Sequence, residues 1–408
     1  MKNNEISIYF NNFSSQGILR INKDGTIFLL NKATFLSLKF LAKYGIENSA
    51  GINDTLDKVI YFLNSHGFPK IENSVIIKEF SSQIPLKRVQ LEITKRCNLR
   101  CKHCYISEYK DVLESSTIYE LIDEAASLGV MDFDLTGGEP LLYQNVEQII
   151  EYILKYGMCT TIFTNAVVIP DNLKKILKKY QGVKFRVSLD GWNSESHDYI
   201  RGKGNFCRTL ANIKELIGLK VPVEVNVILN SKNIIGVKKF RELSNELKIK
   251  FRYDRYLPFS RNDFLSVTDE EYIEALYNLP NFDSRARTIK ENIVDDHKFY
   301  CGAGNSYVFV TASGEVGFCP TLSNTKFSGG NILSDSLAKI WNDSIFFNRI
   351  RKVRCRFYNE CPVNFICQGG CRSRAEFFNG KITDPDIQEC KLAYRISGIV
   401  PAALKGRL

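Results

Sequence analysis

The first eighty residues alternate apolar and polar positions at strand spacing and then change to helical spacing. Strands are predicted over Glu5–Phe10, Gly17–Asn22 and Thr26–Leu30, and helices over Ala33–Tyr44 and Leu56–Ser65. A Lys-Asp-Gly turn at 23–25 separates the last two strands. This order predicts a winged-helix-like domain over residues 1–80. Residues 70–86 are expected to be a linker.

Between residues 87 and 257, strand-length apolar segments alternate with helical periodicity. The predicted strands are Val89–Ile93, Met131–Leu135, Thr160–Phe163, Lys184–Leu189, Val221–Leu229 and Lys250–Tyr253. The predicted helices are Ser116–Leu128, Val146–Tyr156, Asp171–Tyr180, Phe206–Leu216 and Ile235–Leu247. This alternation predicts an α/β fold with a parallel sheet or a partial (β/α)6 barrel. The functional side chains are then expected at the carboxyl ends of the strands.

The last third of the chain lacks this regular alternation. Residues 258–300 are polar and predicted to form a mostly helical connector. Residues 301–408 are rich in cysteine and contain few long periodic segments. A region of this kind is expected to need bound metal to fold.

The net charge of +10 predicts either a solvated basic surface or attraction to an acidic partner such as a peptide. No basic run is interleaved with aromatic residues, so nucleic acid is not an expected partner. No stretch of 18 apolar residues is present, so no membrane partner is expected. Met1–Phe10 lacks the pattern of a secretory signal, which predicts a cytoplasmic location.

The distribution of the 12 cysteines favours metal binding over disulfides. Ten of them fall into two blocks, one over 97–104 and one over 301–390, and only Cys159 and Cys207 lie outside. In the first block, Cys97, Cys101 and Cys104 directly follow a predicted strand. Three thiolates on one short loop can hold three irons of a 4Fe-4S cluster and leave the fourth iron open. The alternative is a structural zinc site with His103 as fourth ligand, although such sites use other spacings.

The Cys-x3-Cys-x2-Cys spacing resembles the signature of the radical S-adenosylmethionine (SAM) superfamily, whose open iron binds SAM. The Gly-Gly-Glu motif after the second strand is similar to the motif that meets the methionine amino group in this family. By this resemblance Ser188 and Arg201 are assigned to the ribose and the carboxylate, and His103 takes the position beside adenine. Asp190 either contacts SAM or shapes the turn. The full set of predicted cofactor contacts is Thr136, Gly137, Gly138, Glu139, Asn165, Ser188, Asp190, Arg201 and His103.

The resemblance implies reductive cleavage of SAM to a 5′-deoxyadenosyl radical, which abstracts a hydrogen atom from the substrate. The electron would come from a donor such as ferredoxin or flavodoxin. Tyr105, Tyr253 and Asp254 are possible cavity residues, but nothing in the sequence singles out a general base, so the catalytic residues are unassigned.

The second cysteine block resembles the SPASM extension of radical SAM enzymes that mature peptides and proteins. The resemblance implies two auxiliary 4Fe-4S clusters and hence three clusters in all. Auxiliary cluster I would take Cys301, Cys319 and Cys371, and auxiliary cluster II would take Cys355, Cys361, Cys367 and Cys390. One departure concerns the gap from Cys355 to Cys361, which holds five residues where the family usually has two. Another is Pro320, which replaces an acidic residue and lowers the expectation of sulfatase maturation.

Residues 1–80 resemble the PqqD-like recognition element that binds the leader of a ribosomally made precursor peptide. Together these resemblances imply a radical SAM peptide maturase that installs a thioether or carbon–carbon crosslink. Decarboxylation, epimerisation, protein maturation or action on a non-peptide substrate are alternatives within the family. From another class, a zinc-stabilised winged-helix DNA regulator remains open, but it gives the Gly-Gly-Glu motif no role.

Overall fold

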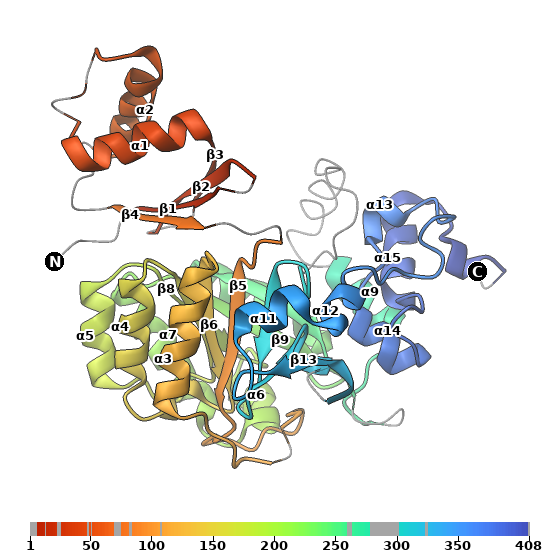
Figure 1. Cartoon of the computed structure of the whole chain (residues 1–408). Coiled ribbons are helices and arrows are strands. Elements are labelled where there is room, and N and C mark those ends of the chain that lie inside the picture. Colours follow the sequence, from red (N-terminus) through yellow and green to blue (C-terminus); the bar gives the residue numbers. More distant parts are fainter. Residues whose placement is uncertain are drawn as a thin grey trace.

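The computed structural model describes residues 6–12, 14–22, 26–46, 49, 51–68, 75–80, 84–106, 108–258, 263–277, 302–322 and 325–406. An N-terminal domain, a parallel α/β barrel and a C-terminal cysteine-rich region follow one another along the chain (Figure 1). Among the described helices, none is long and apolar enough to cross a membrane.

The N-terminal domain is a four-stranded sheet with two helices. Its elements are β1 (Ile6–Asn11), β2 (Gln16–Ile21), β3 (Ile27–Asn31), α1 (Lys32–Tyr44), α2 (Asp54–Ser65) and β4 (Val75–Phe80). The strand order is β3-β2-β1-β4, so β3 forms one edge. The amphipathic face of α1 covers the sheet, where the rings of Phe10 and Phe35 stack 4.1 Å apart. The strands and helices predicted before residue 66 are all present.

The prediction that residues 70–86 are a linker was wrong for their central part. Val75–Phe80 forms β4, which pairs in parallel with β1 along its whole length. The segment has apolar residues at strand density, but its partner lies about seventy residues earlier in the sequence, so only the folded chain identifies it as a strand.

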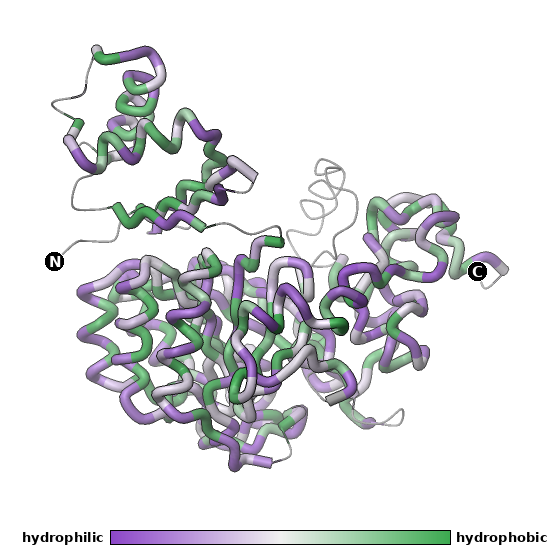
Figure 2. The backbone as a smooth tube through the Cα atoms, in the orientation of Figure 1, coloured by the Kyte–Doolittle hydropathy of each residue, from purple (hydrophilic) through white to green (hydrophobic). Residues whose placement is uncertain are grey.

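The barrel contains six parallel strands in chain order. These are β5 (Arg88–Thr94), β6 (Asp132–Gly137), β7 (Thr160–Thr164), β8 (Val183–Ser188), β9 (Val223–Leu229) and β10 (Lys250–Arg255). The helices between them are α3 (Ser115–Ser127), α4 (Val146–Lys155), α5 (Asp171–Lys179), α6 (Ser194–Arg201), α7 (Asn205–Gly218) and α8 (Val237–Leu247). Hydrophobic and hydrophilic residues alternate along these helices (Figure 2), because one face packs on the sheet. This confirms the predicted α/β class; helix α6 was not predicted.

Three strands of the C-terminal region extend the barrel sheet to nine strands. They are β11 (Tyr307–Val310), β12 (Glu315–Gly317) and β13 (Ser328–Asn331), and β11 pairs in parallel with β5. The remaining helices are α9 (Asp269–Tyr277), α11 (Leu337–Asp343), α12 (Ile345–Ile350), α13 (Asn364–Cys367), α14 (Arg372–Asn379) and α15 (Ile387–Ser397). Trp341 on α11 is fully buried and donates from Nε1 to the carbonyl of Ile84 at 2.8 Å. The cysteine-rich region is thus built onto the edge of the barrel.

The N-terminal domain contacts the barrel at the amino-terminal ends of its strands. The hydroxyls of Ser7 and Tyr9 donate to the carbonyl of Gly157, at 2.9 and 2.7 Å. The ring of Phe80 fills the space beside Gly129, just before β6. This end of the sheet is opposite the carboxyl ends at which the cysteine loop begins (Figure 1).

Candidate functional site

The first cysteine loop begins where β5 ends and is held against the Gly-Gly-Glu segment at the end of β6. The backbone N–H of Gly138 donates to the carbonyl of Thr94, and that of Glu139 donates to the carbonyl of Arg96, both at 2.8 Å. A Cβ at Gly138 would lie 2.4 Å from the Arg96 carbonyl oxygen, and one at Gly137 would lie 2.1 Å from that of Thr94. The two glycines therefore make room for the backbone of the cysteine loop.

The thiols of Cys97, Cys101 and Cys104 are partly buried and lie within electrostatic reach of one another. Burial raises the pKa of Cys97 to about 11, and burial also raises that of Cys101. The backbone N–H of Leu99 lies 3.4 Å from Cys97 Sγ. Since metal ligation requires thiolates, binding at this loop would release protons.

Glu139 is buried, and the end of β7 supplies most of its hydrogen-bond donors. Its Oε1 accepts from the Thr164 hydroxyl at 2.7 Å and from the Leu141 N–H at 3.1 Å, while Oε2 accepts from the Asn165 N–H at 2.7 Å. Burial is the main influence and raises the pKa of Glu139 to about 7, although these hydrogen bonds and Arg201 oppose the rise. The carboxylate is thus fixed beside the cysteine loop.

Asp190 connects the cysteine loop with helix α6. Its Oδ2 lies 2.6 Å from His103 Nε2 and 2.5 Å from Arg201 Nε, while Oδ1 accepts from the Ile228 N–H at 2.8 Å. Burial raises the pKa of Asp190, but Arg201 and His103 outweigh it and hold that pKa well below its usual range. Arg201 Nη1 is also 3.8 Å from Cys101 Sγ. The sequence left open a turn-shaping role for Asp190; the structure shows that it pairs with both His103 and Arg201.

The unpredicted helix α6 is what brings Arg201 to the site. The Asn193 side chain caps its first turn, in a reciprocal arrangement with Ser196. At its other end, the Lys102 N–H of the cysteine loop donates to the carbonyl of Ile200 at 3.0 Å. The Asn193 N-cap three residues before Ser196 is the signal in the sequence that could have located this helix.

The other predicted cofactor contacts lie at the same end of the sheet. Thr136 is the second-last residue of β6, Ser188 is the last residue of β8, and Asn165 follows β7. Asn165 Nδ2 donates to the side-chain oxygen of Asn98 at 2.8 Å and lies 3.9 Å from Cys97 Sγ. The structure therefore gathers the predicted residues from β5 to β8 around one loop.

The pKa values and the exposure of the residues considered as a general base give little support for that role. Burial raises the pKa of Tyr253 far above neutral, so its phenol stays protonated. Tyr105 is about half exposed, at 53%, and Asp254 is exposed. His197 is fully buried, and burial lowers its pKa to about 4, which keeps the ring neutral near pH 7.

Four cysteines of the second block line one small cavity that is partly open to solvent. They are Cys355, Cys361, Cys367 and Cys390, and Gly369 and Asp386 share the wall. The five-residue gap after Cys355 still brings that thiol to the same cavity. Across the part of the chain that the structure describes, no three His, Cys, Asp or Glu side chains converge on a single-ion position. Four thiols around one cavity form a donor set that a 4Fe-4S cluster can use.

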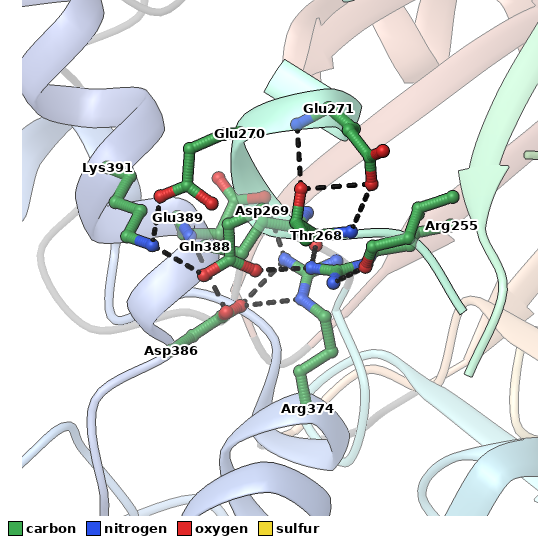
Figure 3. Close-up of polar contacts among 11 residues, drawn as sticks. Arg255, Thr268, Asp269, Glu270, Glu271, Arg374, Asp386, Gln388, Glu389 and Lys391 are labelled. Atoms are coloured by element: carbon green, nitrogen blue, oxygen red, sulfur yellow. Dashed lines mark hydrogen bonds and ion pairs between the residues drawn. The ribbon is translucent and has the colours of Figure 1, made fainter. Parts of the chain in front are cut away.

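An ion-pair network fixes the cavity wall to the barrel (Figure 3). Asp386 Oδ2 accepts from the Cys371 N–H and from Arg374 Nη2, both at 2.7 Å, and Arg374 also pairs with Glu389 at 2.7 Å. Arg255, at the end of β10, donates to Gln388 on α15 at 2.7 Å and pairs with Asp269 on α9 (Figure 3). The second site is therefore held in a fixed relation to the barrel.

The three cysteines predicted for auxiliary cluster I are only partly covered by the described residues. Cys301 lies outside the described residues. Cys319 Sγ is 3.0 Å from the Thr321 hydroxyl, and Cys371 Sγ is 3.1 Å from the Ser373 hydroxyl. The described residues thus contain two of the three thiols predicted for auxiliary cluster I.

Comparison with protein-family models gives two matches. Residues 91–240 match the radical SAM superfamily, and residues 301–371 match an iron–sulfur cluster-binding domain named SPASM. The first match covers the cysteine loop, Glu139, Asp190 and Arg201.

Similar proteins of known activity span most of the chain. The mycofactocin maturase MftC of Mycolicibacterium smegmatis is 28% identical over 320 residues, 73% of this chain and 81% of MftC. The antilisterial bacteriocin subtilosin biosynthesis protein AlbA of Bacillus subtilis is 28% identical over 317 residues, 71% of this chain and 68% of AlbA. The AdoMet-dependent heme synthase of Methanosarcina barkeri is 30% identical over 325 residues, 70% of this chain and 90% of that protein.

Two solved structures share the fold. Streptococcus suis SuiB bound to its precursor peptide SuiA has a TM-score of 0.69 at 17% identity, covering 96% of this chain and 100% of SuiB. The enzyme anSMEcpe with bound AdoMet has a TM-score of 0.65 at 17% identity, covering 77% of this chain and 97% of anSMEcpe.

Proposed function

Because the chain belongs to the radical SAM superfamily and carries a SPASM iron–sulfur domain, we propose that it modifies a ribosomally synthesised precursor peptide by installing a thioether or carbon–carbon crosslink. It is a radical SAM enzyme with SAM and iron–sulfur clusters as cofactors, which removes the alternative of a zinc-binding DNA regulator. The substrate class and the type of crosslink are the proposal.

The observation that carries the peptide assignment is the extent of the match to SuiB. A coverage of 96% includes the N-terminal domain, and that structure holds a precursor peptide. The match to the heme synthase covers 70% of the chain. MftC and AlbA, named for a maturase and for bacteriocin biosynthesis, support the same substrate class.

We assign SAM and its cluster to the carboxyl ends of β5 to β8. Cys97, Cys101 and Cys104 would hold the cluster, which fits the geometry of three partly buried thiols on one loop. The bound cofactor would supply the adenosyl radical chemistry. Glu139 supplies an anchored carboxylate for the methionine ammonium, and Asp190 orients His103 and Arg201 toward the adenine and the carboxylate.

Two auxiliary clusters would accept the electron that the product radical gives up. Auxiliary cluster II is assigned to the four-cysteine cavity, and auxiliary cluster I to Cys301, Cys319 and Cys371. Ferredoxin or flavodoxin is the proposed electron donor. A total of three clusters follows from this assignment.

The leader peptide is proposed to bind at the free edge strand β3. Ile27 and Leu29 on this strand are 49% and 87% exposed, and Leu36 and Phe40 of α1 are also exposed. An extended peptide could add to the edge as a further strand while apolar side chains supply specificity. Since the domain contacts the opposite end of the barrel, the peptide would have to pass along the barrel. The distance along the barrel is about 20 Å, because that is the length of a strand of six residues.

The test is anaerobic reconstitution, with iron and sulfide counting and an assay of 5′-deoxyadenosine in the same sample. Three clusters predict about twelve irons per chain. Candidate precursors, taken from short open reading frames beside the gene, would be co-expressed and examined by mass spectrometry. A loss of two hydrogens that maps to linked residues supports a crosslink. Formation of 5′-deoxyadenosine with every candidate peptide unchanged, but with a porphyrin substrate modified, would overturn the peptide assignment.

A further inference from the structure

Arg372 lies directly after Cys371, at the start of α14, and is 4% exposed. Its Nη1 donates to the carbonyls of Ile382 and Asp384, both at 2.9 Å. Its Nε and Nη2 atoms are buried and have no hydrogen-bond partner among the described residues. Three of the five N–H groups of this buried guanidinium therefore have no acceptor among the described residues.

The neighbouring buried arginine is different. Arg374, on the same helix, pairs with both Asp386 and Glu389 at 2.7 Å. The Asp384 carboxylate lies 3.5 Å from Arg356. Leaving charged N–H groups buried and unpaired costs several kcal/mol. Such atoms in a folded protein indicate an acceptor that the described residues do not supply.

The unpaired Nη2 of Arg372 lies near the wall of the four-cysteine cavity. A Cβ atom added to Gly369 would lie 3.7 Å from Arg372 Nη2. The same added atom would lie 3.6 Å from the Cβ and from the backbone N of Cys355. Gly369 and Cys355 both line the cavity. These distances place the unpaired Nη2 of Arg372 close to the part of the wall that Gly369 and Cys355 form.

We infer that Arg372 donates hydrogen bonds from Nε and Nη2 to sulfur atoms of auxiliary cluster II and raises the potential at which that cluster takes up one electron. Hydrogen bonds to sulfur and nearby net charge are among the factors that set cluster potentials. A fixed positive charge stabilises the reduced, more negative cluster over the oxidised one. Arg372 is thus a positioning residue that favours electron transfer to this cluster. The inference rests on the proposed assignment of the cavity to auxiliary cluster II.

The experiment uses the full chain with Cys97, Cys101 and Cys104 changed to Ala, so that only auxiliary clusters contribute to the EPR signal. Arg372→Gln and Arg372→Lys are compared with this parent in EPR-monitored redox titrations, with iron counted in each sample. Arg356→Gln is the matched control, because Arg356 also neighbours Cys355 in sequence but its side chain is 58% exposed. We expect a more negative midpoint for one auxiliary cluster in Arg372→Gln, a smaller shift in Arg372→Lys and no shift in the control.

A second measurement covers the case in which Arg372→Gln fails to hold its cluster. The parent is labelled with ¹⁵N-guanidino arginine, reduced and examined by pulsed EPR. A weak ¹⁵N coupling that is lost in Arg372→Lys supports the inference. Unchanged midpoints with full iron, or no coupling in the parent, would overturn it. A parent without any iron at the four-cysteine site would instead refute the cluster assignment.

Discussion

Arg20 on β2 donates to Asp132 at the start of β6 across 2.7 Å, and both side chains are only 14% exposed. This pair joins the N-terminal domain to the barrel. Arg88 approaches the other oxygen of Asp132 at 3.5 Å. The N-terminal domain is therefore attached through charged groups at the end of the sheet that is remote from the cysteine loop.

Asp132→Asn is expected to weaken this attachment. The change leaves Arg20 buried without its counter-charge, and removal of one partner from a buried pair costs about 3–5 kcal/mol. Hydrogen exchange of the β1 and β2 amides should rise while the barrel strands stay protected. Asp54→Asn, which breaks an exposed pair with Lys58, is the control and should change nothing. Equal protection in both variants would contradict a role for the buried pair.

Gly138→Ala is expected to abolish the SAM-binding cluster. The new methyl group would lie 2.4 Å from the Arg96 carbonyl oxygen and 2.5 Å from that of Lys95, so the cysteine loop would have to move. Formation of 5′-deoxyadenosine should fall to background, with the iron content lower by about four per chain. Gly218→Ala, at a position with no atom within 4 Å, should retain full activity. An active Gly138→Ala enzyme would show that the loop adapts.

Leu29→Asp is expected to weaken precursor binding at least about tenfold. The reason is that removing the charged Asp side chain from water against an apolar side chain of the peptide costs free energy. Fluorescence anisotropy of a labelled candidate leader would measure the loss. Tyr61→Asp is the matched control, since Tyr61 is 77% exposed and belongs to α2 rather than to the edge strand. Comparable weakening in both variants, or in neither, would argue against β3 as the binding edge.

Glu224 should make the stability of the barrel depend on pH. Burial alone would raise its pKa, but hydrogen bonds from Arg252 and Lys184 lower it to about 2. The folded pKa thus lies below the unfolded value of 4.5, so the stabilisation is complete above pH 4.5 and is lost as the pH falls from there toward 2. Glu224→Gln should cost roughly 2 kcal/mol at pH 7.

Thermal melting between pH 3.5 and 7 checks this prediction. The difference in Tm between the parent and Glu224→Gln should shrink once the pH falls below about 4.5. Glu246→Gln is the control, because Glu246 is 64% exposed and lies 3.8 Å from its partner Lys214. A difference that stays constant over the whole range would mean that Glu224 acts through packing rather than charge.

The sequence by itself determined the barrel and the chemistry of its first site. Apolar periodicity reports which face of a local segment is buried, and in a parallel α/β fold that is enough to order the strands. The spacing of Cys97, Cys101 and Cys104 likewise lies within one loop, so no distant contact was needed to recognise it. The predicted positions Gly138, Glu139 and Asn165 follow strand ends, and the resemblance to the radical SAM motifs assigned them to the cofactor.

The tertiary structure decided what depends on contacts between distant segments. Val75–Phe80 became a strand because β1 pairs with it, and Cys355 reached the common cavity in spite of its longer loop. The pairing of Asp190 with His103 joins residues 87 positions apart, and the unpaired donors of Arg372 have meaning only beside a cavity. Local patterns predict which residues are buried, but the packing of the whole chain determines the partners of buried charges.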